Sequence, residues 1–437
     1  MPTFASFPSM KKVTWIFSVG LVALLLGGCG QEDGKSIDED ANEALEENKR
    51  LKDKIARMEA SKEIDERERE YTVDTPEKNP DPVQALTAEQ IEELVSEAAA
   101  LYDEGKYREA KAKMLQAYAD FERLPTKDKA TRVRYLRWLC KISDALQEND
   151  QAITYATEVA IHAVDDDDRA FAYGLLGQAY YSKGEYDKAL EYYEKALPIY
   201  KKVHGAESTK VGTTYNNIGL GYSNKGEYDK AIRYYEKALA IYLKTLGAEH
   251  PEVATSYNNI GVAYYSKGEY DKALEYYEKD LAIGLNSLGA EHPDVANTYN
   301  NIGSTYDKKG EYDKAIGYFE KCLAIQLKTL GAEHPNVATT YNNIGLAYSN
   351  KGEYDKAIGY YEKSLAIQLK SLGAEHPEVA TTYNNIGLAY SNKGEYDKAL
   401  EYYDKSLAIR REVLSQNVDA PLHRSPQTCR AIVRGFL

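Results

Sequence analysis

The sequence predicts an all-α protein in which two-helix units stack into a solenoid. Three segments recur along the chain at a constant period of 42 residues. Gly-Glu-Tyr-Asp-Lys-Ala occurs six times, Tyr-Asn-Asn-Ile-Gly five times and Leu-Gly-Ala-Glu-His-Pro four times. A unit of this length holds two helices, neither of which can bury its apolar stripe alone. Neighbouring units must therefore pack against one another.

Each unit is predicted to contain two helices joined by a glycine turn. Pro251 can begin the first helix, where a missing N–H costs no hydrogen bond. Gly268 is expected to end this helix in the left-handed conformation that glycine tolerates. The second helix is expected from about Glu269 to Leu288. Apolar residues recur at helical spacing in both helices, namely Val253, Tyr257, Ile260, Gly261 and Tyr264, then Ala273, Leu274, Tyr277, Leu281 and Ile283.

The order of residues within a unit resembles the tetratricopeptide repeat signature. The residues that carry this resemblance in the fourth unit are Tyr215, Ile218, Gly219, Tyr222, Ala231, Tyr235 and Ala238. The 42-residue period, the Leu-Gly-x-x-His-Pro segment and the Asn-Asn pair resemble more narrowly the kinesin light chain type of this repeat. The resemblance covers about residues 88–414. It implies a right-handed α-solenoid, a superhelix of about eight helix-turn-helix units, in which Gly219 and Ala231 let two helices approach closely.

The N-terminus has the order of features found in a bacterial lipoprotein signal peptide. A basic pair, Lys11-Lys12, precedes the apolar run 13–26, which is shorter than the roughly 20 residues of a membrane-spanning helix. The run ends in Leu26-Gly27-Gly28-Cys29, which resembles a lipobox. We therefore expect residues 1–28 to be a signal peptide and Cys29 to be lipidated.

The remaining boundaries follow from changes in composition. Residues 29–84 are expected to form a charged helical stalk and a proline-rich hinge, with 15 acids against nine bases in residues 31–70. Two divergent repeat units occupy residues 85–165, and six regular units occupy residues 166–414. Residues 415–437 lose the period and are expected to form a tail.

The sequence argues against catalysis and against nucleic-acid binding. Catalysis needs unlike groups that converge on one point, whereas near-identical units present the same groups again and again. The net charge of −14 does not suit a phosphate backbone. Cys140 and Cys322 take positions reserved for small packed side chains, and His250, His292, His334 and His376 each precede a helix-starting proline. We expect packing and capping from these residues, and no metal, cofactor or small-molecule substrate.

One polar feature has no evident packing role. An asparagine pair lies within the first helix of each regular unit after the third, and asparagine lowers helix propensity there. In the resembled family the first helices line a concave groove, and groove asparagines hold the backbone of bound peptides. The alternative is that one residue of each pair bonds the neighbouring helix and sets the stacking angle. The candidate residues are Asn216, Asn217, Asn258, Asn259, Asn300, Asn301, Asn342, Asn343, Asn384 and Asn385.

Three departures from the repeat stand out. Asp280 occupies the same alanine site of the second helix as Cys322, and a buried carboxylate is costly there unless it is paired. Pro198 lies inside a second helix and is expected to kink it. Gly174-Leu175 replaces the asparagine pair of the third unit. Regular stacking is therefore least expected around the third and fifth units.

These features together predict a non-enzymatic scaffold, anchored by lipid in a bacterial cell envelope, that binds a peptide or protein partner. The outer membrane, on its periplasmic side, is the default location, because Gly30 is not the aspartate associated with inner-membrane retention. Two alternatives remain. One is a structural protein that self-associates through its stalk or by end-to-end stacking. The other is a peptidoglycan- or glycan-binding module, since the chain has 39 tyrosines, although most are expected in the core.

Overall fold

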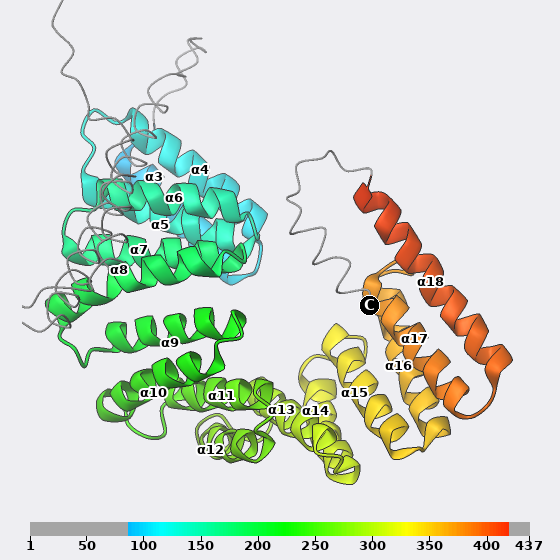
Figure 1. Ribbon diagram of the computed structural model, residues 1–437. Helices are drawn as coiled ribbons and strands as arrows, with labels where there is room; N and C mark the ends of the chain where they lie inside the picture. Colours follow the sequence, from blue (N-terminus) through cyan, green and yellow to red (C-terminus); the bar gives the residue numbers. More distant parts are fainter. Residues whose placement is uncertain (1–85, 419–437) are drawn as a thin grey trace, which may run out of the picture. The chain divides into compact units, whose positions relative to one another are not determined.

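The computed structural model describes residues 86–418, and all regular structure in that range is α-helical (Figure 1). The helices alternate between a first and a second helix of each unit. The first helices are α3 (Ala88–Asp103), α5 (Lys129–Ala145), α7 (Asp166–Ser182), α9 (Thr209–Asn224), α11 (Pro251–Ser266), α13 (Pro293–Lys308), α15 (Pro335–Lys351) and α17 (Pro377–Asn392). The second helices are α4 (Tyr107–Arg123), α6 (Asn149–His162), α8 (Tyr186–His204), α10 (Tyr228–Thr245), α12 (Tyr270–Ser287), α14 (Tyr312–Thr329), α16 (Tyr354–Ser371) and α18 (Tyr396–Val418).

Each helix packs against the helices directly before and after it in the chain. The two helices of one unit pack most extensively, and each second helix also packs on the first helix of the next unit. Beyond these neighbours, contacts join first helices of adjacent units, such as α9 with α11 and α11 with α13. This nearest-neighbour pattern confirms the predicted all-α solenoid. None of the helices described is long and apolar enough to cross a membrane.

The signals that delimit the helices act as predicted. His250 precedes Pro251, and its Nδ1 accepts a hydrogen bond of 3.2 Å from the backbone N–H of Glu252. The same cap is present at His292, His334 and His376. Gly268 follows α11 with a φ of +79°, a left-handed conformation that glycine adopts without strain. The histidines are therefore helix caps that satisfy N–H groups otherwise left without a partner.

Close approach of the two helices in a unit depends on a glycine beneath an aromatic ring. A methyl group added at Gly219 would lie 2.6 Å from Cδ1 of Tyr235, a separation that no packed structure tolerates. Tyr277 covers Gly261 in the same way. Tyr235 and Tyr277 are buried, as expected, whereas Tyr222 and Tyr264 are half-buried rather than core residues. The ring of Tyr222 stacks on Tyr234 and the ring of Tyr264 on Tyr276, both tyrosines of the second helices.

The departures from the repeat have different outcomes. Helix α8 continues through Pro198, and it packs on α9 as extensively as the other regular joints do. The expectation of irregular stacking after the third unit is therefore wrong, and the kink at Pro198 stays a prediction. At the fifth unit the expectation is confirmed, because α12 packs less extensively on α13 than the second helices pack at the other regular joints. The predicted signal peptide, Cys29 and the stalk lie outside the described residues, as does the tail beyond residue 418.

Candidate partner-binding site

The asparagine pairs form a ladder of side-chain hydrogen bonds between successive first helices. In each case the second asparagine of a pair donates from Nδ2 to Oδ1 of the first asparagine of the preceding unit. The four bonds run from Asn259 to Asn216 (3.0 Å), Asn301 to Asn258 (2.9 Å), Asn343 to Asn300 (3.0 Å) and Asn385 to Asn342 (3.1 Å). The structure therefore supports the stacking role for eight of the ten predicted site residues.

The two remaining asparagines lie at the ends of the ladder. Asn217 has no amide acceptor in the unit before it, because Gly174 stands at the corresponding position. Asn384 lies on α17, and no first helix follows α17 among the described residues. No later asparagine there donates to Asn384. Both are half-buried, like the other eight. The ladder thus begins where the sequence departs from its repeat and ends with the last unit.

Each rung leaves hydrogen-bonding capacity unused. An amide side chain has two donor hydrogens and an oxygen with two lone pairs. In the Asn301–Asn258 rung the bond uses one donor hydrogen of Asn301 and one lone pair of Asn258. The Nδ2 group of Asn258 and the side-chain oxygen of Asn301 take no part in this bond and have no side-chain partner in the described protein. These groups repeat in the same register from unit to unit, so stacking does not exhaust the ladder.

The surface beside the ladder is polar and carries isolated apolar side chains. Val262 and Leu346 are each 37% exposed on the first helices, and Leu388 is exposed in the same position of the last unit. Thr213, Thr255 and Asn297 are also exposed on this side of their helices. We call this surface, formed by the ladder and these neighbours, the first-helix face.

The tyrosines in the middle of the second helices are engaged within the protein. Tyr234 stacks on Tyr222 with ring centroids 5.5 Å apart and an angle of 13° between the rings. The Lys237 ammonium lies 4.8 Å from the centroid of Tyr234. Equivalent stacks recur from Tyr180–Tyr192 to Tyr390–Tyr402. Apart from Tyr180, which is buried, these rings are half-buried, and their faces contact one another and lysine side chains. This leaves little free aromatic surface on which a sugar could stack.

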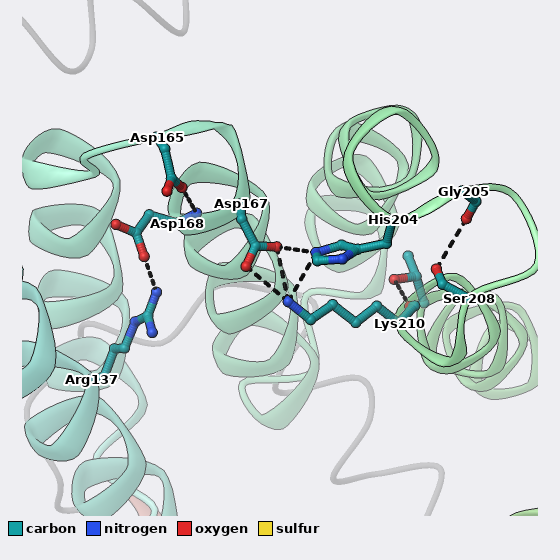
Figure 2. Close-up of polar contacts among 9 residues, drawn as sticks. Arg137, Asp165, Asp167, Asp168, His204, Gly205, Ser208 and Lys210 are labelled. Atoms are coloured by element: carbon teal, nitrogen blue, oxygen red, sulfur yellow. Dashed lines mark hydrogen bonds and ion pairs between the residues drawn. The ribbon is translucent and has the colours of Figure 1, made fainter.

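Ionic contacts hold the third unit to its neighbours (Figure 2). Asp167 at the start of α7 lies 2.6 Å from Nε2 of His204 and 2.8 Å from Nζ of Lys210, while Arg137 pairs with Asp168. Burial raises the pKa of Asp167, but the bonds with Lys210 and His204 outweigh burial and hold that pKa below its ordinary value. The cluster links α5 to α7 and α7 to α8 and α9.

The same cluster has the residue types of a hydrolase triad but not its geometry. In a triad the serine hydroxyl contacts the histidine nitrogen opposite the one that faces the carboxylate. Here the Ser208 hydroxyl donates to the carbonyl of Gly205 at 3.0 Å (Figure 2). Nε2 of His204 faces Asp167 and Lys210 together. The arrangement is that of a structural joint.

Sequence reasoning singled out Asp280 but missed its surroundings. The Asp280 carboxylate is buried, and its Oδ2 accepts a hydrogen bond of 2.7 Å from the hydroxyl of Thr298 on α13. Its neighbour Gly284 was not recognised as unusual, although the equivalent residues of the other regular units have long side chains. Comparing each unit with the next at that position would have found it.

The fold and the ladder define the class of protein. It is an α-solenoid of stacked helical hairpins with a polar ladder on one helix face. The tetratricopeptide repeat model matches residues 144–202, 210–284, 267–328, 294–368 and 336–412. These segments cover more than half of the chain, and the chain belongs to the tetratricopeptide repeat family. No curated protein sequence matches it significantly.

Several solved structures resemble the chain. A putative kinesin light chain from Podosopora anserina with nearly identical repeats is 28% identical, covering 47% of this chain and 98% of its own, with a TM-score of 0.43. BtubC (BKLC) from P. vanneervenii is 28% identical, covering 56% of this chain and 94% of its own, with a TM-score of 0.44. The apo form of RapI is 16% identical, covering 75% of this chain and 99% of its own, with a TM-score of 0.53, and shares the fold.

Proposed function

We propose that the chain is a non-enzymatic scaffold that binds an extended peptide or protein partner along the first-helix face. The observation that carries this proposal is the unused donor and acceptor capacity of the asparagine ladder. Family membership supports it in general terms, because nothing about this repeat fold points to catalysis. An extended backbone presents N–H and C=O groups at regular intervals, and a regular array of amides can bind it without reading its side chains.

The ladder also makes the face suitable as a binding platform. Its hydrogen bonds hold each first helix in a fixed register against the next, so the free amide groups are positioned before any partner arrives. Such preorganisation lowers the entropy that binding must offset. The stacking role and the binding role are therefore compatible, because they use different atoms of the same side chains.

The proposal is tested with random linear peptides displayed on phage and selected on the full-length chain. Selected peptides are then measured on a variant with Val262→Glu and Leu346→Glu, which places charge on the first-helix face. The matched control is Leu285→Glu with Leu327→Glu, because these leucines of the second helices are 38% and 37% exposed. We expect binding to fall in the face variant and to persist in the control. Equal binding by both, or no selected peptide, would contradict the proposal.

We further propose that Cys29 carries the lipid that anchors the scaffold in a bacterial envelope, with the outer membrane as the default. The support is the order of basic pair, apolar run and Leu-Gly-Gly-Cys in the sequence. Cys29→Ser is expected to abolish labelling by radioactive palmitate. Labelling that persists in the variant would contradict the proposal that Cys29 carries the lipid.

A second candidate function is self-association through the end of the array. Leu400 on α18 is 61% exposed, whereas Leu274, the equivalent residue of an internal unit, is 7% exposed because the next unit covers it. Helix α18, the last helix among the described residues, thus presents a surface like the one that internal units bury. Light scattering should show oligomers of the full-length chain that Leu400→Lys dissociates. A wild-type monomer would exclude this candidate.

A glycan-binding function is the weaker alternative, because the half-buried tyrosines stack on one another. The test is sedimentation of the protein with purified cell wall. Protein that stays in the supernatant would exclude glycan binding. Retention on the cell wall that survives the face variant would favour it over peptide binding.

A further inference from the structure

The fifth unit differs from the other regular units at two neighbouring positions of its second helix. At the first position the other regular units have a small uncharged residue, whereas this unit has Asp280. The residues there are Ala196, Ala238, Asp280, Cys322, Ser364 and Ser406. The second position, one helical turn later, carries a long side chain except in this unit: Tyr200, Tyr242, Gly284, Gln326, Gln368 and Arg410. The fifth unit therefore gains a carboxylate and loses the side chain that would lie beside it.

The long side chain fills the joint in the neighbouring units. In the fourth unit Tyr242 packs with Val253 of the next unit, and its ring also lies against Gly212 of α9, where an added methyl group would approach Cε1 of the ring to 2.8 Å. In the sixth unit Oε1 of Gln326 accepts a hydrogen bond of 2.7 Å from the hydroxyl of Thr340. Gln368 accepts the same bond from Thr382 in the seventh unit. Gly284 supplies no such group.

A cleft of about 210 Å³ occupies this place between α11, α12 and α13. Asp280, Gly284 and Ser287 line it from α12, Thr298 from α13 and Thr255 from α11. Asn258 and Asn301, which form one rung of the asparagine ladder, line it too. The cleft is therefore continuous with the first-helix face.

The Asp280 carboxylate has an incomplete set of partners within the protein. Its side chain is 9% exposed, and Oδ2 accepts the Thr298 hydroxyl at 2.7 Å. Oδ1 has no hydrogen-bond partner in the described protein, and none of the residues that line the cleft is basic. Burial raises the pKa of Asp280 to about 6, with Asp294 adding to the effect and the Thr298 hydroxyl opposing it. A buried carboxylate with a perturbed pKa in a cleft is a typical mark of a functional position.

The lining selects the chemistry of an occupant. Asp280 and Asp294 are the charged groups that face the cleft, and the other polar groups are amides and hydroxyls. Among the described residues no group of three potential ligands is arranged to hold a metal ion. A positively charged hydrogen-bond donor of modest size fits this lining, and a guanidinium or an ammonium group satisfies a carboxylate strongly.

We propose that the cleft between α11, α12 and α13 receives an arginine or lysine side chain of the bound partner, with Asp280 as its counter-ion. The inference rests on the proposed function, since the peptide held by the ladder delivers the basic side chain. The cleft would select one side chain of the partner at the fifth unit, whereas the rest of the first-helix face binds the peptide backbone. The rung formed by Asn258 and Asn301 places the peptide backbone beside the mouth of the cleft.

Two variants test the role of the carboxylate and the role of the empty space separately. Asp280→Ser removes the charge and installs the residue found at this site in the seventh and eighth units. Gly284→Gln keeps the charge and fills the cleft with the residue of the sixth and seventh units. An added Cβ at Gly284 would lie 3.2 Å from Cγ2 of Val295, a contact that needs only a small adjustment. Helical content by circular dichroism confirms that both variants fold.

The experiment selects random phage-displayed peptides on the full-length wild type and on both variants. Arginine or lysine is expected at a fixed position of the wild-type peptides and at no fixed position in peptides selected by either variant. Replacing that arginine by neutral citrulline should weaken binding to the wild type about ten- to a hundredfold, the range of a charged hydrogen bond. Peptides without a basic preference would overturn the inference and leave the proposed function standing.

A second measurement does not depend on peptide selection. N-acetylarginine amide is titrated into the wild type and into Asp280→Ser, with N-acetylcitrulline amide as the neutral control, and binding is followed by NMR at Thr298. Saturable shifts with the arginine compound on the wild type alone support a cation site even if no peptide is selected. Shifts that are equal for both compounds, or equal in both proteins, would overturn it and leave a cleft that holds water only.

Discussion

Replacing Asp280 with alanine should stabilise the protein near neutral pH. The ordinary pKa of an aspartate is 3.8, and burial raises the pKa of Asp280 to about 6. The folded state therefore holds the proton more tightly than the unfolded state. The resulting penalty is absent below about pH 3.8 and fully developed above about pH 6. This difference between the two pKa values corresponds to about 3 kcal/mol.

The expected net gain is smaller than the full penalty. Asp280→Ala also removes the acceptor of the Thr298 hydroxyl, a hydrogen bond that contributes about 1 kcal/mol. That hydroxyl keeps a second acceptor, because the backbone carbonyl of Asp294 lies 3.0 Å away. Alanine occupies the equivalent site in the third and fourth units, so the backbone tolerates it. We therefore expect a gain of about 1–2 kcal/mol near pH 7 and none near pH 4.

Urea unfolding of the full-length chain at several pH values measures the effect. Hydrogen exchange of α12 and α13 should accompany it, because a repeat array can open one unit at a time. Ser364→Ala is the matched control, since Ser364 occupies the same site, has a buried hydroxyl without a partner and does not titrate. Its effect should not depend on pH. If Asp280→Ala is destabilising by the same amount at pH 4 and pH 7, the reasoning about the buried carboxylate is refuted.

Two further predictions concern packing and the ladder. Gly261→Ala should destabilise the protein by about 1–3 kcal/mol, because the methyl group would lie 2.7 Å from Cε1 of Tyr277, and Gly359→Ala, which meets nothing within 4 Å, should stabilise it. Urea midpoints of the two variants that move in the same direction would contradict this. Asn343→Ala should cost about 1 kcal/mol by breaking a rung, whereas Asn217→Ala breaks none and should be nearly neutral. Equal losses in thermal unfolding would argue against the ladder as a stacking device.

The fold could be predicted from the sequence because the repeat supplies the same evidence in every regular unit. A glycine follows each helix from α7 to α17, proline begins the first helices of the last four units, and small residues at fixed positions mark the close approach of helices. The roles of His250 and Gly268 follow from local chemistry alone, and the structure confirms them. The lipidation of Cys29 stays a prediction, since it lies outside the described residues.

The candidate site could be predicted only in part, because its geometry depends on neighbouring units. The sequence identified the asparagine pair but could not decide between stacking and binding. The bond from Asn301 to Asn258 depends on how two first helices are placed, which periodicity does not determine. The stacking of Tyr264 on Tyr276 depends likewise on how the two helices of the unit are placed. The cleft beside Asp280 was missed because it results from a side chain that Gly284 lacks.

Site-specific photo-crosslinking tests most directly whether the first-helix face binds the partner. A photoreactive amino acid replaces Val262 or Leu346 on this face, and Leu285 or Leu327 on the second helices, all with nearly equal exposure. Each protein is irradiated with a peptide selected on the wild type. We predict crosslinks from residues 262 and 346 and none from residues 285 and 327. Crosslinks from the second helices alone, or equally from both faces, would contradict the account.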